Sequence, residues 1–171
     1  MILSMIENKV AASELVVLDL KTFISDDPII SFDLKDYLFR GLILKEKDFR
    51  SSLEVTDWEK YKGKIVLVFC SADVIIPVWA YMLIAVYLNP IAARIIYGNQ
   101  EDWINKQLID SINQMDTEPF IDKKVVIKGC GDIFISEAAY FEITKKLLPV
   151  VKSIMYGEPC STVPIYKRKT N

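Results

Sequence analysis

The feature that most constrains this sequence is a regular alternation of apolar runs and helical patterns from about Tyr61 onward. The short runs are rich in β-branched residues and predict buried strands at residues 64–69, 93–97, 124–128 and 152–156. The segments between them predict helices at residues 76–88, 101–113 and 136–148, the last with Ser136 as its N-cap. A βαβαβαβ order predicts a parallel sheet with right-handed crossovers and helices on both faces.

We therefore expect a three-layer α/β fold with a mainly parallel sheet of four or more strands. We assign residues 61–157 to this core and expect the four strands to follow a flavodoxin-like order, 2-1-3-4. Residues 1–60 suggest two short strands and two short helices, an α+β extension packed on the core as an N-terminal layer. Residues 158–171 form a tail stiffened by Pro159 and Pro164, which we expect to fold over the sheet edge. The expectation is one domain over residues 1–171, without an internal repeat.

Composition narrows the class of protein. A content of 51% hydrophobic and 26% charged residues is enough for a substantial core and argues against disorder. The net charge of −2 gives no overall reason to bind nucleic acid or a membrane surface. The longest apolar run, residues 74–88, is shorter than the roughly 20 residues of a membrane span and contains Pro77. With no signal peptide evident and an odd number of cysteines, we expect reduced thiols in the cytoplasm.

The chain contains no histidine, which excludes several kinds of chemistry. A Ser-His-Asp triad, a Cys-His dyad and every histidine-ligated metal site need an imidazole. No glycine-rich dinucleotide fingerprint follows the first predicted strand, because Cys70-Ser71-Ala72-Asp73 occupies that place. A Walker A pattern is absent as well. The alternation of strands and helices alone is therefore no evidence for a nucleotide-binding site.

Each of the three cysteines, Cys70, Cys130 and Cys160, lies just past the C-terminal end of a predicted strand. In an open parallel sheet, that edge is where ligands bind. In the order 2-1-3-4 the three strands concerned are neighbours, so their loops would meet. Three thiolates there could hold zinc or an iron–sulfur cluster, with Asp73 or Asp132 as a fourth ligand. This three-cysteine site is our first functional hypothesis.

The same edge allows other interpretations. Cys70 at a strand-to-helix turn could be a nucleophile in sulfur or acyl transfer, because a helix N-terminus stabilises a thiolate. It could equally be a small apolar residue in the core, as cysteines often are. A small-molecule pocket built from Ser71, Ser161, Thr162 and backbone amides, without thiol chemistry, is a further alternative. Whether the protein is an enzyme stays open at this point.

A second hypothesis comes from a different class of function. The predicted helix around residues 79–88 is apolar on nearly all faces, so one face should meet the sheet and another an N-terminal layer or a second subunit. With aromatics such as Tyr156 and Tyr166, it would form the surface of a non-catalytic binding or assembly module, with a homodimer expected. The cysteines would then be core residues.

Several stretches resemble a family of small Bacteroidetes proteins catalogued as domain of unknown function 2480. The resemblance lies in residues 42–50 (LILKEKDFR), 70–73 (CSAD), 77–82 (PVWAYM), 126–130 (VIKGC) and, most specifically, 152–164 (KSIMYGEPCSTVP). All three cysteines fall in these stretches. The resemblance implies no particular activity, cofactor or partner.

Overall fold

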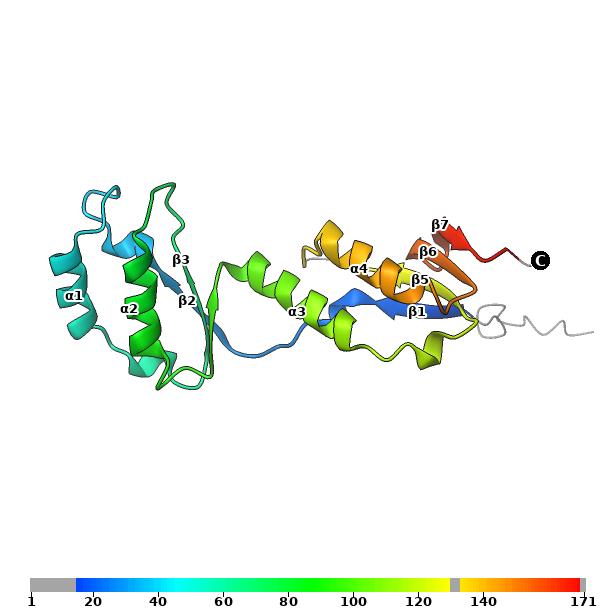
Figure 1. Cartoon of the computed structure of the whole chain (residues 1–171), viewed down its shortest axis with the longest axis horizontal. Coiled ribbons are helices and arrows are strands. Elements are labelled where there is room, and N and C mark those ends of the chain that lie inside the picture. The colour runs from blue at the N-terminus through cyan, green and yellow to red at the C-terminus, as the bar shows by residue number, and fades with distance from the viewer. Residues whose placement is uncertain (1–14, 130–132, 170–171) are drawn as a thin grey trace, which may run out of the picture. The chain divides into compact units, whose positions relative to one another are not determined.

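The computed structural model describes residues 15–129 and 133–169. It confirms the α/β class and divides the chain into two compact units, coloured along the chain in Figure 1. Unit 1 comprises Met1–Ser25 and Ile104–Asn171, and unit 2 comprises Asp26–Trp103. Unit 2 is thus continuous in sequence, whereas unit 1 is assembled from two separate segments.

Unit 2 contains a parallel three-stranded sheet in the order β2-β3-β4. Its elements in chain order are β2 (Ile29–Asp33), the 3-10 helix η2 (Leu34–Tyr37), α1 (Glu46–Glu54), η3 (Glu59–Tyr61), β3 (Ile65–Phe69), α2 (Val78–Leu88) and β4 (Arg94–Tyr97). On one face of the sheet, Val66 and Val68 share a buried cluster with residues of both helices. On the other face, Ile65 and Leu67 pack with Trp103. Strand β3 is therefore buried on both faces, as its continuous apolar run predicts.

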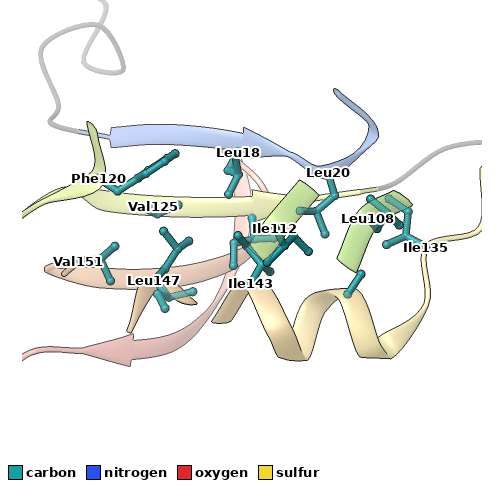
Figure 2. Close-up of a cluster of buried hydrophobic side chains, with 13 residues drawn as sticks. Leu18, Leu20, Leu108, Ile112, Phe120, Val125, Ile135, Ile143, Leu147 and Val151 are labelled. Carbon is teal, nitrogen blue, oxygen red and sulfur yellow. The ribbon is translucent and has the colours of Figure 1, made fainter. Parts of the chain in front are cut away.

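Unit 1 contains a four-stranded sheet in the order β1-β5-β6-β7, in which the last strand is antiparallel. Its elements are β1 (Leu15–Asp19), η1 (Leu20–Phe23), α3 (Gln100–Gln114), η4 (Glu118–Phe120), β5 (Lys124–Lys128), α4 (Glu137–Leu147), β6 (Ser153–Glu158) and β7 (Ser161–Lys167). Helix α3 begins in the last residues of unit 2 and continues into unit 1. Figure 2 shows the core of unit 1, where Leu108 and Ile112 of α3 and Ile143 of α4 meet the apolar side chains of the sheet.

The two units repeat one motif, which runs strand, 3-10 helix, helix, 3-10 helix, strand, helix, strand. The strand registers agree: Ile65 of β3 pairs with Ile29 and Arg94, and Lys124 of β5 pairs with Leu15 and Ser153. From α1 onward, equivalent residues are 59 positions apart, as Ile65 and Lys124 are. Unit 2 follows η1 and ends within the first turn of α3, so that one copy of the motif is nested inside the other in the sequence.

The equivalence extends to buried side chains and backbone hydrogen bonds. Helix α2 buries Ala80, Ile84 and Leu88, and α4 buries the same residue types at the equivalent places, which are Ala139, Ile143 and Leu147. Before β3 and β5, Gly63 and Asp122 both have a positive φ, of 67° and 56°. Their backbone N–H groups donate to the carbonyls of Ile91 and Val150, each at 2.9 Å. Such agreement in both packing and backbone geometry identifies an internal repeat.

This arrangement corrects three expectations. The predicted order 2-1-3-4 does not occur, because β3 and β4 lie in one sheet and β5 and β6 in another. Strands β1 and β2 do not form a separate layer, since each pairs as the edge neighbour of a predicted core strand. The physical reason is that alternation predicts parallel strands but does not specify which strands are neighbours. The internal repeat was not expected, because the units share buried positions more than residue identities. The single domain stays a prediction.

The C-terminal segment also differs from the expected tail. Residues 161–167 form β7, which pairs antiparallel beside β6 rather than folding over the sheet edge. Gly157, with a φ of 121°, permits the turn between the two strands, since a Cβ there would lie 2.6 Å from the carbonyl oxygen of Ser161. Arg168 then pairs with Asp122 and donates to the carbonyl of Val150. The end of the described chain is therefore held against unit 1.

Candidate functional site

The C-terminal edge of the unit 2 sheet brings together the ends of β2 and β3. Cys70 is half-buried just after β3, and its Sγ lies 3.7 Å from the carbonyl oxygen of Ala72, to which the thiol donates. The backbone N–H of Ser71 donates to Asp33 Oδ1 at 3.0 Å, and that of Lys35 donates to the same oxygen at 2.9 Å. Asp33 therefore ties the loop carrying Cys70 to the end of β2, while Asp73 is exposed.

Two groups at this edge have shifted pKa values. Partial burial acts to raise the pKa of Asp33, but hydrogen bonds from Ser71 and the Lys35 backbone outweigh it, and the pKa lies below its usual value. Burial raises the pKa of Tyr81, with smaller contributions from Tyr97, Cys70 and Asp33. Asp33 is thus an anion and Tyr81 a neutral phenol at neutral pH, so the first can accept a hydrogen bond and the second can donate one.

Tyr81 of α2 also forms a pocket with Tyr97 of β4. The ring centroids are 5.2 Å apart in an edge-to-face arrangement. Val68, Ala85 and Ile95 complete the lining of a cavity of about 250 Å³. Tyr97 is 77% exposed, so the pocket is bounded on the outer side by a side chain that lies largely in solvent.

Unit 1 contains the same pocket at the equivalent positions. Tyr140 of α4 and Tyr156 of β6 are 5.4 Å apart, again edge to face. The cavity measures about 260 Å³, and its other lining residues are Ile127, Thr144, Ile154 and Ile165. Of these, all but Ile165 are the repeat equivalents of the unit 2 lining. Sequence reasoning missed both pockets, although the equal spacing of the two tyrosine pairs was a signal that could have revealed them.

The remaining predicted site residues lie on the hairpin between β6 and β7. Cys160 and Ser161 are exposed at the turn. Thr162 is half-buried, with its hydroxyl 3.8 Å from the sulfur of Met155. No side chain at this turn is positioned to activate the Cys160 thiol among the contacts of the described residues. The turn therefore offers an accessible thiol but no surrounding site.

The strand order that would bring the three cysteines together does not occur. Cys70 follows a strand of unit 2, whereas Cys160 follows a strand of unit 1, so the strands concerned are not neighbours in one sheet. Cys130 and Asp132 lie outside the described residues. Within residues 15–129 and 133–169, no group of three or more Cys, Asp or Glu side chains could hold a metal ion. The three-cysteine site stays a prediction.

Helix α2 carries the most unusual surface of unit 2. It contains no charged residue, and its N-cap, Pro77, makes no side-chain capping hydrogen bond. Beyond the buried face, Val78, Met82 and Val86 are 74%, 64% and 70% exposed. Their spacing of four residues aligns them in one apolar stripe along the helix, which we call the α2 stripe.

The aromatic residues expected on the same surface belong to unit 1. Tyr156 is 40% exposed beside its pocket, whereas Tyr166 is half-buried against the core and is not a free surface residue. In the described part of the chain, no helix has the length and apolar character needed to cross a membrane.

Residues 4–168 match a family model described as a protein of unknown function, DUF2480. Because the match covers almost the whole chain, the protein belongs to this family. No curated protein and no solved structure matches the chain.

Proposed function

We propose that this DUF2480 protein is a non-catalytic assembly module that associates with a second copy of itself through the α2 stripe. The observation that carries the proposal is the combination of Val78, Met82 and Val86 on the exposed side of a helix without a charged residue. Single exposed apolar residues are ordinary, but a continuous uncharged stripe of this kind is typical of an interaction surface.

The fold does not need this stripe. Helix α2 already buries Ala80, Ile84 and Leu88, the three residues that face the sheet. Helix α4 buries the same three residue types, yet its residues at the positions of the stripe are Glu137, Phe141 and Lys145. A helix at this place can therefore pack on the sheet with charged residues on its outer face. The apolar outer face of α2 is not needed for that packing.

A second copy suits this stripe better than a charged partner does. Because neither charge nor buried hydrogen-bonding group occurs on it, two stripes can pack together without leaving an ionic group unpaired. The helix has 11 residues, so it is about 16 Å long and buries less than the roughly 800 Å² per partner of a standard interface. We therefore expect a reversible dimer whose population depends on protein concentration.

In this proposal the cysteines have no catalytic role. Cys70 packs beside the unit 2 core, and its thiol donates within its own loop. Cys160 is an exposed free thiol, which suits a reducing compartment, so we also propose a cytoplasmic location.

The experiment is sedimentation velocity over a wide range of protein concentration, with a matched pair of variants. Met82→Glu places a charge in the stripe, and Phe141→Glu places the same charge at the equivalent position of α4. The two side chains are 64% and 65% exposed, so their intrinsic effects on folding should be alike. We expect the wild type and Phe141→Glu to dimerise with rising concentration and Met82→Glu to stay monomeric. A wild type that is monomeric throughout would contradict the proposal.

A further inference from the structure

The two repeats differ at the outer edge of the sheet. In unit 1, β7 pairs antiparallel with β6 from Ser153 to Glu158. In unit 2, the equivalent strand β4 is the last of its sheet, and no described strand pairs with its outer side. Among the described strands, none hydrogen-bonds to the backbone N–H and C=O groups on that side of β4, and an open edge of this kind can accept another chain.

The same difference affects the tyrosine pockets. Ile165 of β7 lines the Tyr140–Tyr156 pocket, where the register shifts between Ile154 and Met155. The Tyr81–Tyr97 pocket has no lining residue from a fourth strand. Tyr97 is 77% exposed, while Tyr156, beside β7, is 40% exposed. Unit 2 thus has the equivalent pocket without the strand that borders it in unit 1.

We propose that β4 accepts an extended, antiparallel strand from a partner polypeptide, which adds an aliphatic side chain to the lining of the Tyr81–Tyr97 pocket. Unit 1 shows the chemistry of such a strand: β7 has the sequence STVPIYK, and its isoleucine is one of the residues that line the pocket. Strand addition to an open edge obtains affinity from main-chain hydrogen bonds and specificity from pockets for alternate side chains.

The pocket determines which strands fit. Its walls are Val68, Ala85 and Ile95 with the two tyrosine rings, so no charged side chain is available to pair with a charge on the incoming strand. A branched aliphatic side chain matches this apolar and aromatic lining, as Ile165 does in unit 1. Because β4 has only four residues, backbone pairing is short, and the side chain that joins the pocket lining should determine most of the selectivity.

The test uses a synthetic peptide with the β7 sequence and the full-length protein. Binding is measured by calorimetry, and the site is located from backbone amide shifts in the NMR spectrum. We expect the amides of β4 to shift, and we expect a peptide with Ile165→Asp to bind about tenfold more weakly or worse, equivalent to 1.4 kcal/mol or more. In the protein, Ala85→Phe should block the pocket and reduce binding to a similar degree. Val55→Phe, at a position 85% exposed at the end of α1, should leave it unchanged.

Several results would overturn the inference. These are absence of peptide binding, amide shifts confined to β6, or equal binding by the Ile165→Asp peptide. If Ala85→Phe abolished self-association and the peptide competed with the dimer, a second copy would be the occupant of β4 instead. Met82→Glu separates the two proposals, because it should abolish the dimer through the α2 stripe and leave peptide binding intact.

Discussion

Helices α2 and α4 occupy equivalent places in the two repeats, and the contrast between them separates what the fold requires from what the surface adds. Their inward residues are identical in type, Ala, Ile and Leu at a spacing of four. Their outward residues differ: α4 has a glutamate, a phenylalanine and a lysine, and α2 has valine, methionine and valine. Helix α4 also has a Ser136 cap and an ion pair between Glu142 and Lys145 at 2.8 Å. The repeat thus provides an internal control for the surface of α2.

The largest loss of stability should come from substitutions at the core positions that are equivalent in the two repeats. Ile84 and Ile143 are both fully buried at equivalent positions, and replacing either with alanine should cost about 2–5 kcal/mol. Urea unfolding of Ile84→Ala and Ile143→Ala, followed by circular dichroism, measures the two losses. Similar losses would support the equivalence of the repeats. A large loss for one variant and a negligible loss for the other would contradict the equivalence of the repeats.

The next comparison concerns the turn before β3 and β5. Gly63 has a φ of 67° and open space where a Cβ would lie, so Gly63→Ala should cost about 1–2 kcal/mol from backbone strain alone. Gly63→Asp introduces the residue that unit 1 has at this position and should cost less, because aspartate tolerates a positive φ better than alanine does. Thermal unfolding measures the destabilisation of both variants. If Gly63→Asp cost as much as Gly63→Ala, the turn before β3 would not accept aspartate as the turn before β5 does.

A pH-dependent contribution is expected from Asp33. Its folded pKa lies below its usual value, so its stabilising effect is complete above the unfolded pKa of about 3.9 and is lost as pH falls through the folded pKa. Asp33→Asn should therefore destabilise unit 2 at neutral pH by about 1 kcal/mol or less, since the group is partly exposed. The difference between wild type and variant should shrink in acid. A constant difference down to strongly acidic pH would contradict this assignment.

A smaller effect on stability, but a large one on assembly, should follow from giving α2 the charged residues of α4. The variant Val78→Glu/Val86→Lys changes two exposed side chains, so the free energy of unfolding should change by about 0.5 kcal/mol or less. Sedimentation should nevertheless show loss of the dimer. A dimer that survives this exchange would place the interface elsewhere.

The smallest effect is expected from Cys160, which is exposed at the β6–β7 turn. Cys160→Ser should leave both stability and self-association unchanged, to within about 0.5 kcal/mol. Metal analysis of protein purified without air, with and without this substitution, tests the three-cysteine prediction directly. Stoichiometric zinc or iron that depends on Cys160 would favour that site over the assembly proposal.

The helices and strands of this fold could be predicted well from the sequence, but the pairing of the strands could not. Local patterns located β5 and the cap at Ser136, because apolar periodicity and capping depend on neighbouring residues. The pairing of β1 with β5 depends on residues far apart in the chain, and alternation contains no information about it. Strand β7 was missed because prolines at 159 and 164 suggested a stiff tail, although Pro164 lies on an edge strand, where it is tolerated.

The candidate surface was predicted in outline, because the apolar helix around residues 79–88 is visible in the composition of that segment. Which of its faces stays exposed was not predictable, since this depends on how α2 packs on the sheet. The tyrosine pockets depend on a repeat whose copies are nested, so a search at one fixed period does not align β1 with β2. The cysteine cluster depended on strand order, which was the least determined part of the prediction.

The nesting of unit 2 within unit 1 has a consequence for the order of events during synthesis. As the chain leaves the ribosome, β1 emerges first but its partner β5 emerges only after the whole of unit 2. Strand β1 must wait unpaired, whereas all strands of unit 2 are available as soon as β4 is complete. Folding of unit 2 would then shorten the effective loop between β1 and β5 and reduce the entropy cost of closing it. The inserted copy would thus assist the outer one to fold.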